Sequence, residues 1–393
     1  MYWTIPEPYA IPFVKPLRWS SWWRGFSLCA MAILLVGCGS YFWFKDPRLL
    51  LYTFGVVVVL ILVFAGIAGW NMYRYGVEAE HAEDISNLNR LTTLQWQRWA
   101  QQSVSVLGFH ALFPSAVLSL YNSDGPVNGD APLPLPPFNG YSALFTDQLL
   151  PLLPELQQLI AERILLEVTL PEGCDADEWQ LFTQAWQMLG LPVSSLLTSP
   201  AVPVGYGSQM TSWLASPSIK ARLVLIHHRD AQQTTTEGAV IWLLAPQAGR
   251  ASGLPVRCSL HRPMRTPLPV ELAAFRCFLD YQPLTTDMNG LWNDIVTHEQ
   301  ADALLIAHSQ RPQTEDSNGE KNEAAVAPPL PEQHYLPHWL GKTGPYHDWF
   351  TITLMMQMTL AKPGVQCAMI NDGDTALLSS VSTGAFRHEK PLF

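Results

Sequence analysis

The side chains that could carry chemistry do not fall into any recognised motif along this chain. None of its six cysteines forms a C-x-x-C pair, so the spacing of a zinc site or of a disulfide framework is missing. The sequence also lacks the G-x-S-x-G turn of hydrolases. Both glycine-rich patterns that cradle nucleotide phosphates are absent too. These observations exclude the commonest hydrolase, nucleotide-binding and zinc-binding signatures.

Two pairs of histidines come closest to a metal site. His227 and His228 are adjacent within an apolar run. Neighbouring residues of a strand point to opposite faces, so this pair cannot bind one ion. His334 and His338 have the i, i+4 spacing of a helical metal pair, but Pro337 lies between them. We therefore expect neither pair to hold a metal.

Asp372 and Asp374 flank Gly373, and this pattern is typical of a hairpin turn rather than of a calcium loop. With no better candidate elsewhere, the sequence predicts no metal, no cofactor and no catalytic residue. The partner-binding residues stay unknown.

Composition narrows the class of protein. The 393 residues include 23 basic and 33 acidic side chains, a net charge of −10, and 48% of them are hydrophobic. This excludes a disordered chain and argues against nucleic acid as the main partner. Residues 1–76 contain six basic and two acidic side chains, whereas the remainder is strongly acidic. The change in charge marks a boundary near residue 76.

Two uncharged runs precede that boundary. Phe26 to Phe44 and Tyr52 to Trp70 are 19 residues each, which as helices would match a hydrocarbon core about 30 Å thick. Lys45-Asp46-Pro47-Arg48 separates them, and Trp and Tyr residues cluster at their ends. We predict a transmembrane helical hairpin. The alternatives are a buried core helix, a signal peptide, or a lipid anchor at the lipobox-like Leu35 to Cys38, which a second span would make redundant.

Basic residues near the spans predict the orientation. Lys15, Arg18 and Arg24 favour an N-terminal tail that stays in the cytoplasm. Two spans return the chain to the same side, so the large C-terminal part is expected to face the cytoplasm. Its four cysteines, with no disulfide pattern, fit that compartment.

Beyond a polar, helical stalk, apolar strands alternate with amphipathic helices. Strands are predicted at 104–109, 164–170, 221–227 and 239–245, with a helix ending at Gly190. A similar order follows: strands at 256–260 and Ala303–Ala307, helices at 270–279 and 349–360, and a hairpin over 365–381. The strands are too continuously apolar for one exposed face. We therefore predict an α/β domain with a sheet buried on both sides and an internal duplication.

Three segments resemble the β-ketoacyl synthases and thiolases. Ala221–Asp230 is similar to the strand that follows their nucleophile helix, and Thr236–Ala245 to their E-G-A strand. Lys342-Thr343-Gly344, the helix after it and the Cys367–Val381 strand pair resemble their C-terminal segment. The resemblance implies a thiolase-like domain with a duplicated αβαβα layout.

The expected organisation has five parts: a cytoplasmic N-tail (1–25), the transmembrane helical hairpin (26–70), a helical stalk (71–100), a first thiolase-like half (101–265) and a second half (266–393).

More narrowly, the chain resembles the type VI lipase adaptor family. The supporting features are the T-G before a Met-rich helix, the D-G hairpin, the expected Leu304–Ser309 strand before a long loop, and the membrane segment. The resemblance implies a non-catalytic adaptor or chaperone at the bacterial inner membrane. Its partners would be a lipase effector, expected to be a phospholipase, and the secretion spike protein.

A condensing enzyme requires a cysteine thiolate at a helix N-terminus. The window Ser194–Ser212 contains no cysteine, and Ser208 is nearest the slot. Pro345 occupies the place of the family's histidine, and His347 follows two residues later. Cys367 is expected in the core. The sequence thus predicts a protein that is not an enzyme. A membrane-associated acyl-condensing enzyme and an immunity or scaffold membrane protein stay open as alternatives.

Overall fold

The computed structural model describes residues 3–17, 19–117, 129, 131–171, 176–198, 205–230, 232–248, 253–282, 288–294, 298–310 and 330–384. The chain forms two compact units. One is Ile5–Gln95, and the other combines Met1–Thr4 with Trp96–Phe393. The long loop expected after Leu304–Ser309, over residues 310–332, falls almost entirely outside the described residues. Cys174, one of the four cysteines of the C-terminal part, also lies outside them.

The first unit is built on two long helices, α1 (Trp19–Phe44) and α2 (Pro47–Ala100). Both are long and apolar enough to cross a bilayer, and they contain the two predicted runs. Their apolar windows are almost wholly exposed, as lipid-facing side chains would be, and do not form a soluble core. The predicted stalk is the continuation of α2 without a break.

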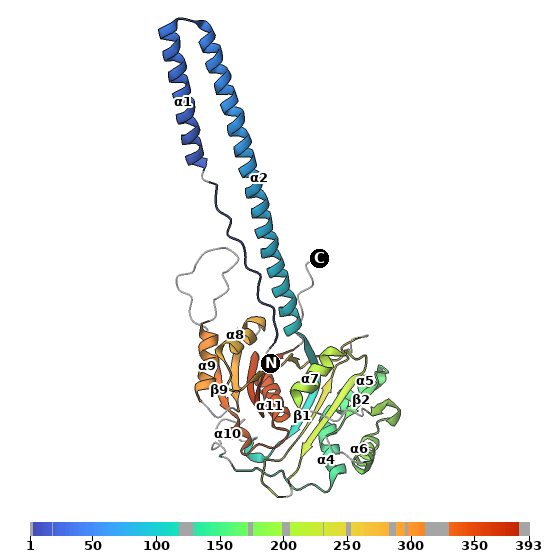
Figure 1. Cartoon of the computed structure of the whole chain (residues 1–393). Helices are drawn as coiled ribbons and strands as arrows, with labels where there is room; N and C mark the ends of the chain where they lie inside the picture. Colours follow the sequence, from blue (N-terminus) through green and yellow to red (C-terminus); the bar gives the residue numbers. More distant parts are fainter. Residues whose placement is uncertain are drawn as a thin grey trace. The chain divides into compact units, whose positions relative to one another are not determined.

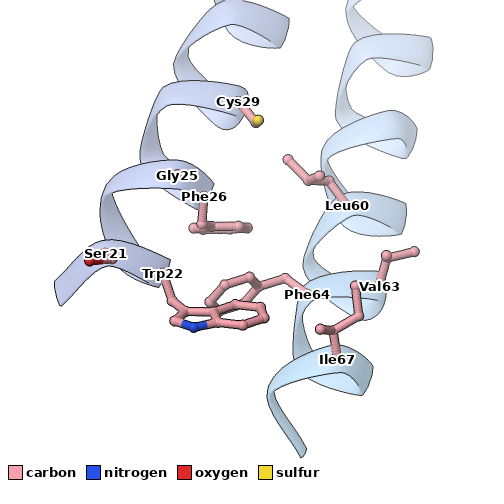
Figure 2. Close-up of a pocket in the computed structure, with 9 residues that line it drawn as sticks. All are labelled: Ser21, Trp22, Gly25, Phe26, Cys29, Leu60, Val63, Phe64 and Ile67. Atoms are coloured by element: carbon pink, nitrogen blue, oxygen red, sulfur yellow. The ribbon is translucent and has the colours of Figure 1, made fainter. Parts of the chain in front are cut away.

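The turn between these helices follows from its residues. Lys45 adopts a positive φ of 52°, and the Asp46 carboxylate accepts a hydrogen bond from the amide of Arg48 at 2.9 Å. Pro47 then starts α2, where its missing N–H costs nothing. Further along, Phe26 and Phe64 face each other with ring centroids 4.6 Å apart and line an apolar groove between the helices (Figure 2).

The second unit contains a mixed sheet in two sets of strands. In the first set the order is β3-β2-β4-β5-β1, and β5 runs against its neighbours. These strands are β1 (Ser103–Leu112), β2 (Leu166–Thr169), β3 (Leu196–Thr198), β4 (Ala221–His228) and β5 (Gly238–Leu244).

The second set repeats this arrangement. Its order is β9-β8-β10-β11-β6, and β11 again runs against its neighbours. These strands are β6 (Cys258–His261), β8 (Met288–Asn293), β9 (Glu332–Tyr335), β10 (Val365–Asp372) and β11 (Thr375–Thr383), and β7 (Met264–Pro267) also pairs with β11. The first strands of the two sets, β1 and β6, pair antiparallel. The same order and directions occur twice, so the predicted duplicated α/β fold is confirmed.

Helices cover both faces of these strands. The first-set helices are α4 (Tyr141–Leu149), α5 (Leu153–Ala161) and α6 (Ala176–Met188), and those of the second set are α8 (Leu272–Tyr281), α9 (His298–Ser309) and α10 (Leu336–Leu340). Between them lie α7 (Tyr206–Ala215) and α11 (His347–Ala361) (Figure 1). One buried cluster joins α7 and α11 to strands of both sets. The central helices are therefore sandwiched between the two halves.

Burial on both faces explains why the sequence of strand β4 is continuously apolar. Leu223 and Leu225 pack with the cluster under α4, α5 and α6, whereas Val224 and Ile226 pack with the central helices. Each alternate side chain is buried on one face or the other, as the sequence predicted.

The expected strand at Ala303–Ala307, extended as Leu304–Ser309, is wrong: the segment belongs to helix α9. Leu304, Ala307 and His308 are buried while Ile306 is exposed, which is a helical spacing that a five-residue apolar run could not reveal. The strand at this place in the repeat is β8, which the sequence reading missed.

Trp349 is the centre of the sandwich. It is fully buried on α11, and its ring lies 4.8 Å from Trp242 and 5.7 Å from Tyr206. We expect Trp349→Ala to lower the free energy of unfolding by about 3–5 kcal/mol, because the cavity would open between both halves. Urea denaturation of the detergent-solubilised chain, followed by near-UV circular dichroism, measures this.

Leu360→Ala on the exposed face of the same helix is the matched control, and its effect should stay within about 0.5 kcal/mol. Equal effects of the two substitutions would contradict a central position for α11.

Candidate functional site

The N-termini of the two central helices meet at one carboxylate. The Tyr206 amide, at the start of α7, donates to Oδ2 of Asp348 at 2.7 Å. Oδ1 of Asp348 accepts from the amide of Trp349 at 2.8 Å. A carboxylate in this place is favourable because helix N-termini carry partial positive charge. The pKa of Asp348 is nevertheless raised, mainly by burial, against the opposing effects of His347 and of these amides.

His347 begins α11 and is held on both sides of its ring. Nδ1 lies 3.1 Å from the Gly344 carbonyl oxygen, and Nε2 lies 2.8 Å from that of Asn371. Oδ2 of Asp294 is 3.3 Å from Nε2. Each ring nitrogen thus faces an oxygen atom, so the ring is held on both sides.

Asp294 supplies the charge opposite this ring. It directly follows β8, and burial raises its pKa while the neighbouring His347 partly offsets that effect. Asp372, at the end of β10, forms a half-exposed ion pair with Arg265 of β7 at 2.9 Å. Three carboxylates, an imidazole and a guanidinium therefore gather around the start of α11. We call Asp294, His347 and Asp348 the acidic–histidine cluster.

None of the described residues is an activated nucleophile. The window Ser194–Ser212 contains Ser208 in the first turn of α7, where its amide donates to the Gly205 carbonyl. Residues 199–204 lie outside the described part. Gly205 itself leaves little room: a Cβ there would lie 3.2 Å from Oδ2 of Asp348.

The cysteines in the described part of the domain, Cys258, Cys277 and Cys367, are unsuited to nucleophilic attack. Cys258 and Cys367 are buried in β6 and β10, which confirms the expected core place of Cys367. Burial raises the pKa of Cys258 and raises that of Cys277 to about 11. A reactive thiolate needs the opposite shift.

The histidine pairs separate as expected. His227 points towards α4 and α6, with its ring 5.3 Å from Tyr141 and its Nε2 3.8 Å from Glu178. His228 points to the other face, where its Nε2 lies 2.9 Å from the Thr235 hydroxyl.

His334 and His338 fall in different elements. His334, in β9, stacks on Trp292 at 4.4 Å, and His338, in α10, packs on Tyr335. In the described part of the chain no group of three or more His, Cys, Asp or Glu side chains could hold a metal ion.

The Thr343-Gly344 segment packs closely against His228 of β4. A Cβ on Gly344 would lie 2.9 Å from Nε2 of His228, so only glycine lets this loop approach. The loop between β4 and β5 is tied down by Asp230, which accepts bonds from the amides and hydroxyls of Thr234 and Thr235. These bonds hold the pKa of Asp230 well below its usual range. Asp230 therefore ties Thr234 and Thr235 of this loop together.

Sequence reasoning singled out His347 but missed Asp294, Asp348 and Arg265. An aspartate in the first turn of a helix is a usual N-terminal signal, so Asp348 could have been found. Asp294 could not, because the strand before it was not recognised. Arg265 lies on a four-residue strand that has no pattern of its own.

No family model and no curated protein matches this chain. Among solved structures it is similar to a tetronic acid condensing enzyme (11% identity, TM-score 0.39, 71% of this chain and 100% of that one). It is also similar to PksG, an HMG-CoA synthase from Bacillus subtilis (13%, 0.40, 72% and 81%). A third is OleA of Xanthomonas campestris bound with cerulenin (10%, 0.39, 73% and 98%). At these values the likeness is one of general architecture, and the fold assignment rests on the strand order above.

Burial of Asp294 predicts a pH dependence. Because its pKa is raised above 3.8, the folded chain still holds this proton at pH values where the unfolded chain has lost it. Stability from this group therefore falls as pH rises through that window. We expect the unfolding free energy of the wild type, relative to Asp294→Asn, to decrease from about pH 4 towards neutrality. Urea denaturation at several pH values measures the difference, and a flat or rising difference would contradict the assignment.

Proposed function

We propose that this chain is a membrane-anchored binding protein that has the architecture of a condensing enzyme but does not transfer acyl groups. The Asp348 carboxylate on the first amide of α7 carries the proposal. A condensing enzyme uses this helix end to stabilise a thiolate. Here a carboxylate already accepts the bond that the helix end offers, and its charge would repel a thiolate beside it.

A large rigid domain without a nucleophile is suited to holding another polypeptide. Tethering through α1 and α2 would keep that polypeptide concentrated at the bilayer. The narrower proposal is an adaptor that binds a type VI lipase effector at the cytoplasmic face of the inner membrane and aids its loading on the spike. This narrower proposal rests on the sequence resemblance alone.

The alternative is an acyl-condensing enzyme. The contact between His347 and Asp294 favours it, because a histidine paired with a carboxylate beside a helix N-terminus is a possible acid–base pair. This reading also needs a nucleophile, for which Ser208 is the described residue nearest the expected slot. An immunity or scaffold protein that blocks the effector is a further alternative.

Covalent labelling distinguishes the first two readings. We expect the detergent-solubilised full chain to form no adduct with cerulenin or an acyl thioester, measured by intact mass, because no described side chain is an activated nucleophile. A genuine condensing enzyme run in parallel is the positive control. A stoichiometric adduct that Ser208→Ala abolishes would overturn the proposal.

Topology and phenotype test the anchored-adaptor reading. Reporters placed before Met1 and after Phe393 should both give the cytoplasmic signal, because two spans return the chain to its starting side. Deleting the gene in a bacterium that carries it should abolish secretion of the effector. Self-intoxication after deletion would instead indicate immunity, and a periplasmic signal would contradict the proposed orientation.

A further inference from the structure

The N-terminal end of the chain is bound to the domain. Trp3 precedes the membrane hairpin by sixteen residues, yet only 9% of its surface is exposed. Its indole Nε1 donates to the Pro263 carbonyl oxygen at 3.3 Å. Its ring lies edge-on to Trp99 at 5.6 Å and tilted against Phe278 at 6.0 Å. Met1–Thr4 accordingly belongs to the same compact unit as Trp96–Phe393.

The pocket that receives this indole is held by other contacts. The Arg262 guanidinium lies 4.2 Å over the Trp99 ring, and its Nε donates to the Trp99 carbonyl oxygen at 3.1 Å. Trp96 packs edge-on against Trp99 at 5.2 Å. Gln282, just after α8, donates to the carbonyl oxygens of Ala100 and Arg262. We call Trp99, Pro263 and Phe278 the indole socket, and these bonds fix its walls without help from Trp3.

A second contact lies farther along the tail. The amide and carbonyl of Tyr9 both bond to the side-chain amide of Asn89 on α2, at 2.9 Å each. This paired bond recognises backbone and therefore requires an extended segment. Prolines at 6, 8, 12 and 16 favour such an extended, stiff backbone.

We propose that the indole socket is a binding site for an extended, tryptophan-bearing peptide segment, and that the chain's own N-terminal tail is its occupant. Because the occupied socket belongs to the domain, the N-terminus lies on the same side of the bilayer as the domain. Neither statement depends on whether the domain is an adaptor or an enzyme.

The test uses full-length chains in detergent and a fluorescent peptide copying residues 1–13. In the wild type the tail occupies the socket and competes with the peptide. We expect the Trp3→Ala chain to bind the peptide at least about tenfold more tightly than the wild type, because buried tryptophans dominate such contacts. The Phe13→Ala chain is the matched control, since Phe13 is 83% exposed on the same tail, and it should behave as the wild type. A peptide carrying the same Trp3→Ala change should bind none of the chains.

Equal affinity for all three chains, or no binding to the Trp3→Ala chain, would overturn the proposal. Hydrogen exchange on the wild-type chain gives a measurement that needs no variant. The Tyr9 amide should exchange at least about tenfold more slowly than in the free peptide. Exchange as fast as in the free peptide would overturn the bound, extended tail.

Discussion

The arrangement of the domain depends on two helix ends that meet at one carboxylate. Asp348 accepts hydrogen bonds from the first amide of α7 and from the amide that follows it in α11. Both helices are buried between the halves of the sheet, where partial charges act more strongly than they do in water. The Asp348 carboxylate offsets the partial positive charge of these helix ends, while its own burial raises its pKa.

The duplication explains why such a meeting point exists. Each half contributes five strands in the same order and one central helix, α7 or α11, and β1 pairs antiparallel with β6. A repeat of this kind brings equivalent elements together at the centre. The two halves differ at that centre. Helix α7 follows Gly205 and starts with the fully buried Tyr206 and the small Gly207, whereas α11 starts with His347 and Asp348.

Much of this fold follows from the sequence, and the exceptions have physical causes. Long or distinctive segments were predicted correctly from their residues alone. These are the apolar runs of β4 and β5, the apolar helix α11 and the D-G hairpin. The prediction of a strand around Leu304 fails because a run of five apolar residues fits a strand or a helix equally well. Of the acidic–histidine cluster, His347 was singled out, but Asp294 is brought to it only by the tertiary fold. Trp3 is more than 90 positions from each residue of the indole socket, and no local pattern reports such a contact.

The length of α2 amplifies any change in the direction of the helix. About 30 residues continue beyond its apolar run, which as a helix measure roughly 45 Å. A change of ten degrees in tilt would move the polar end of α2 sideways by about 8 Å. A helix of this composition, placed in a bilayer, would therefore turn a small change in bilayer thickness into a larger movement of its polar end.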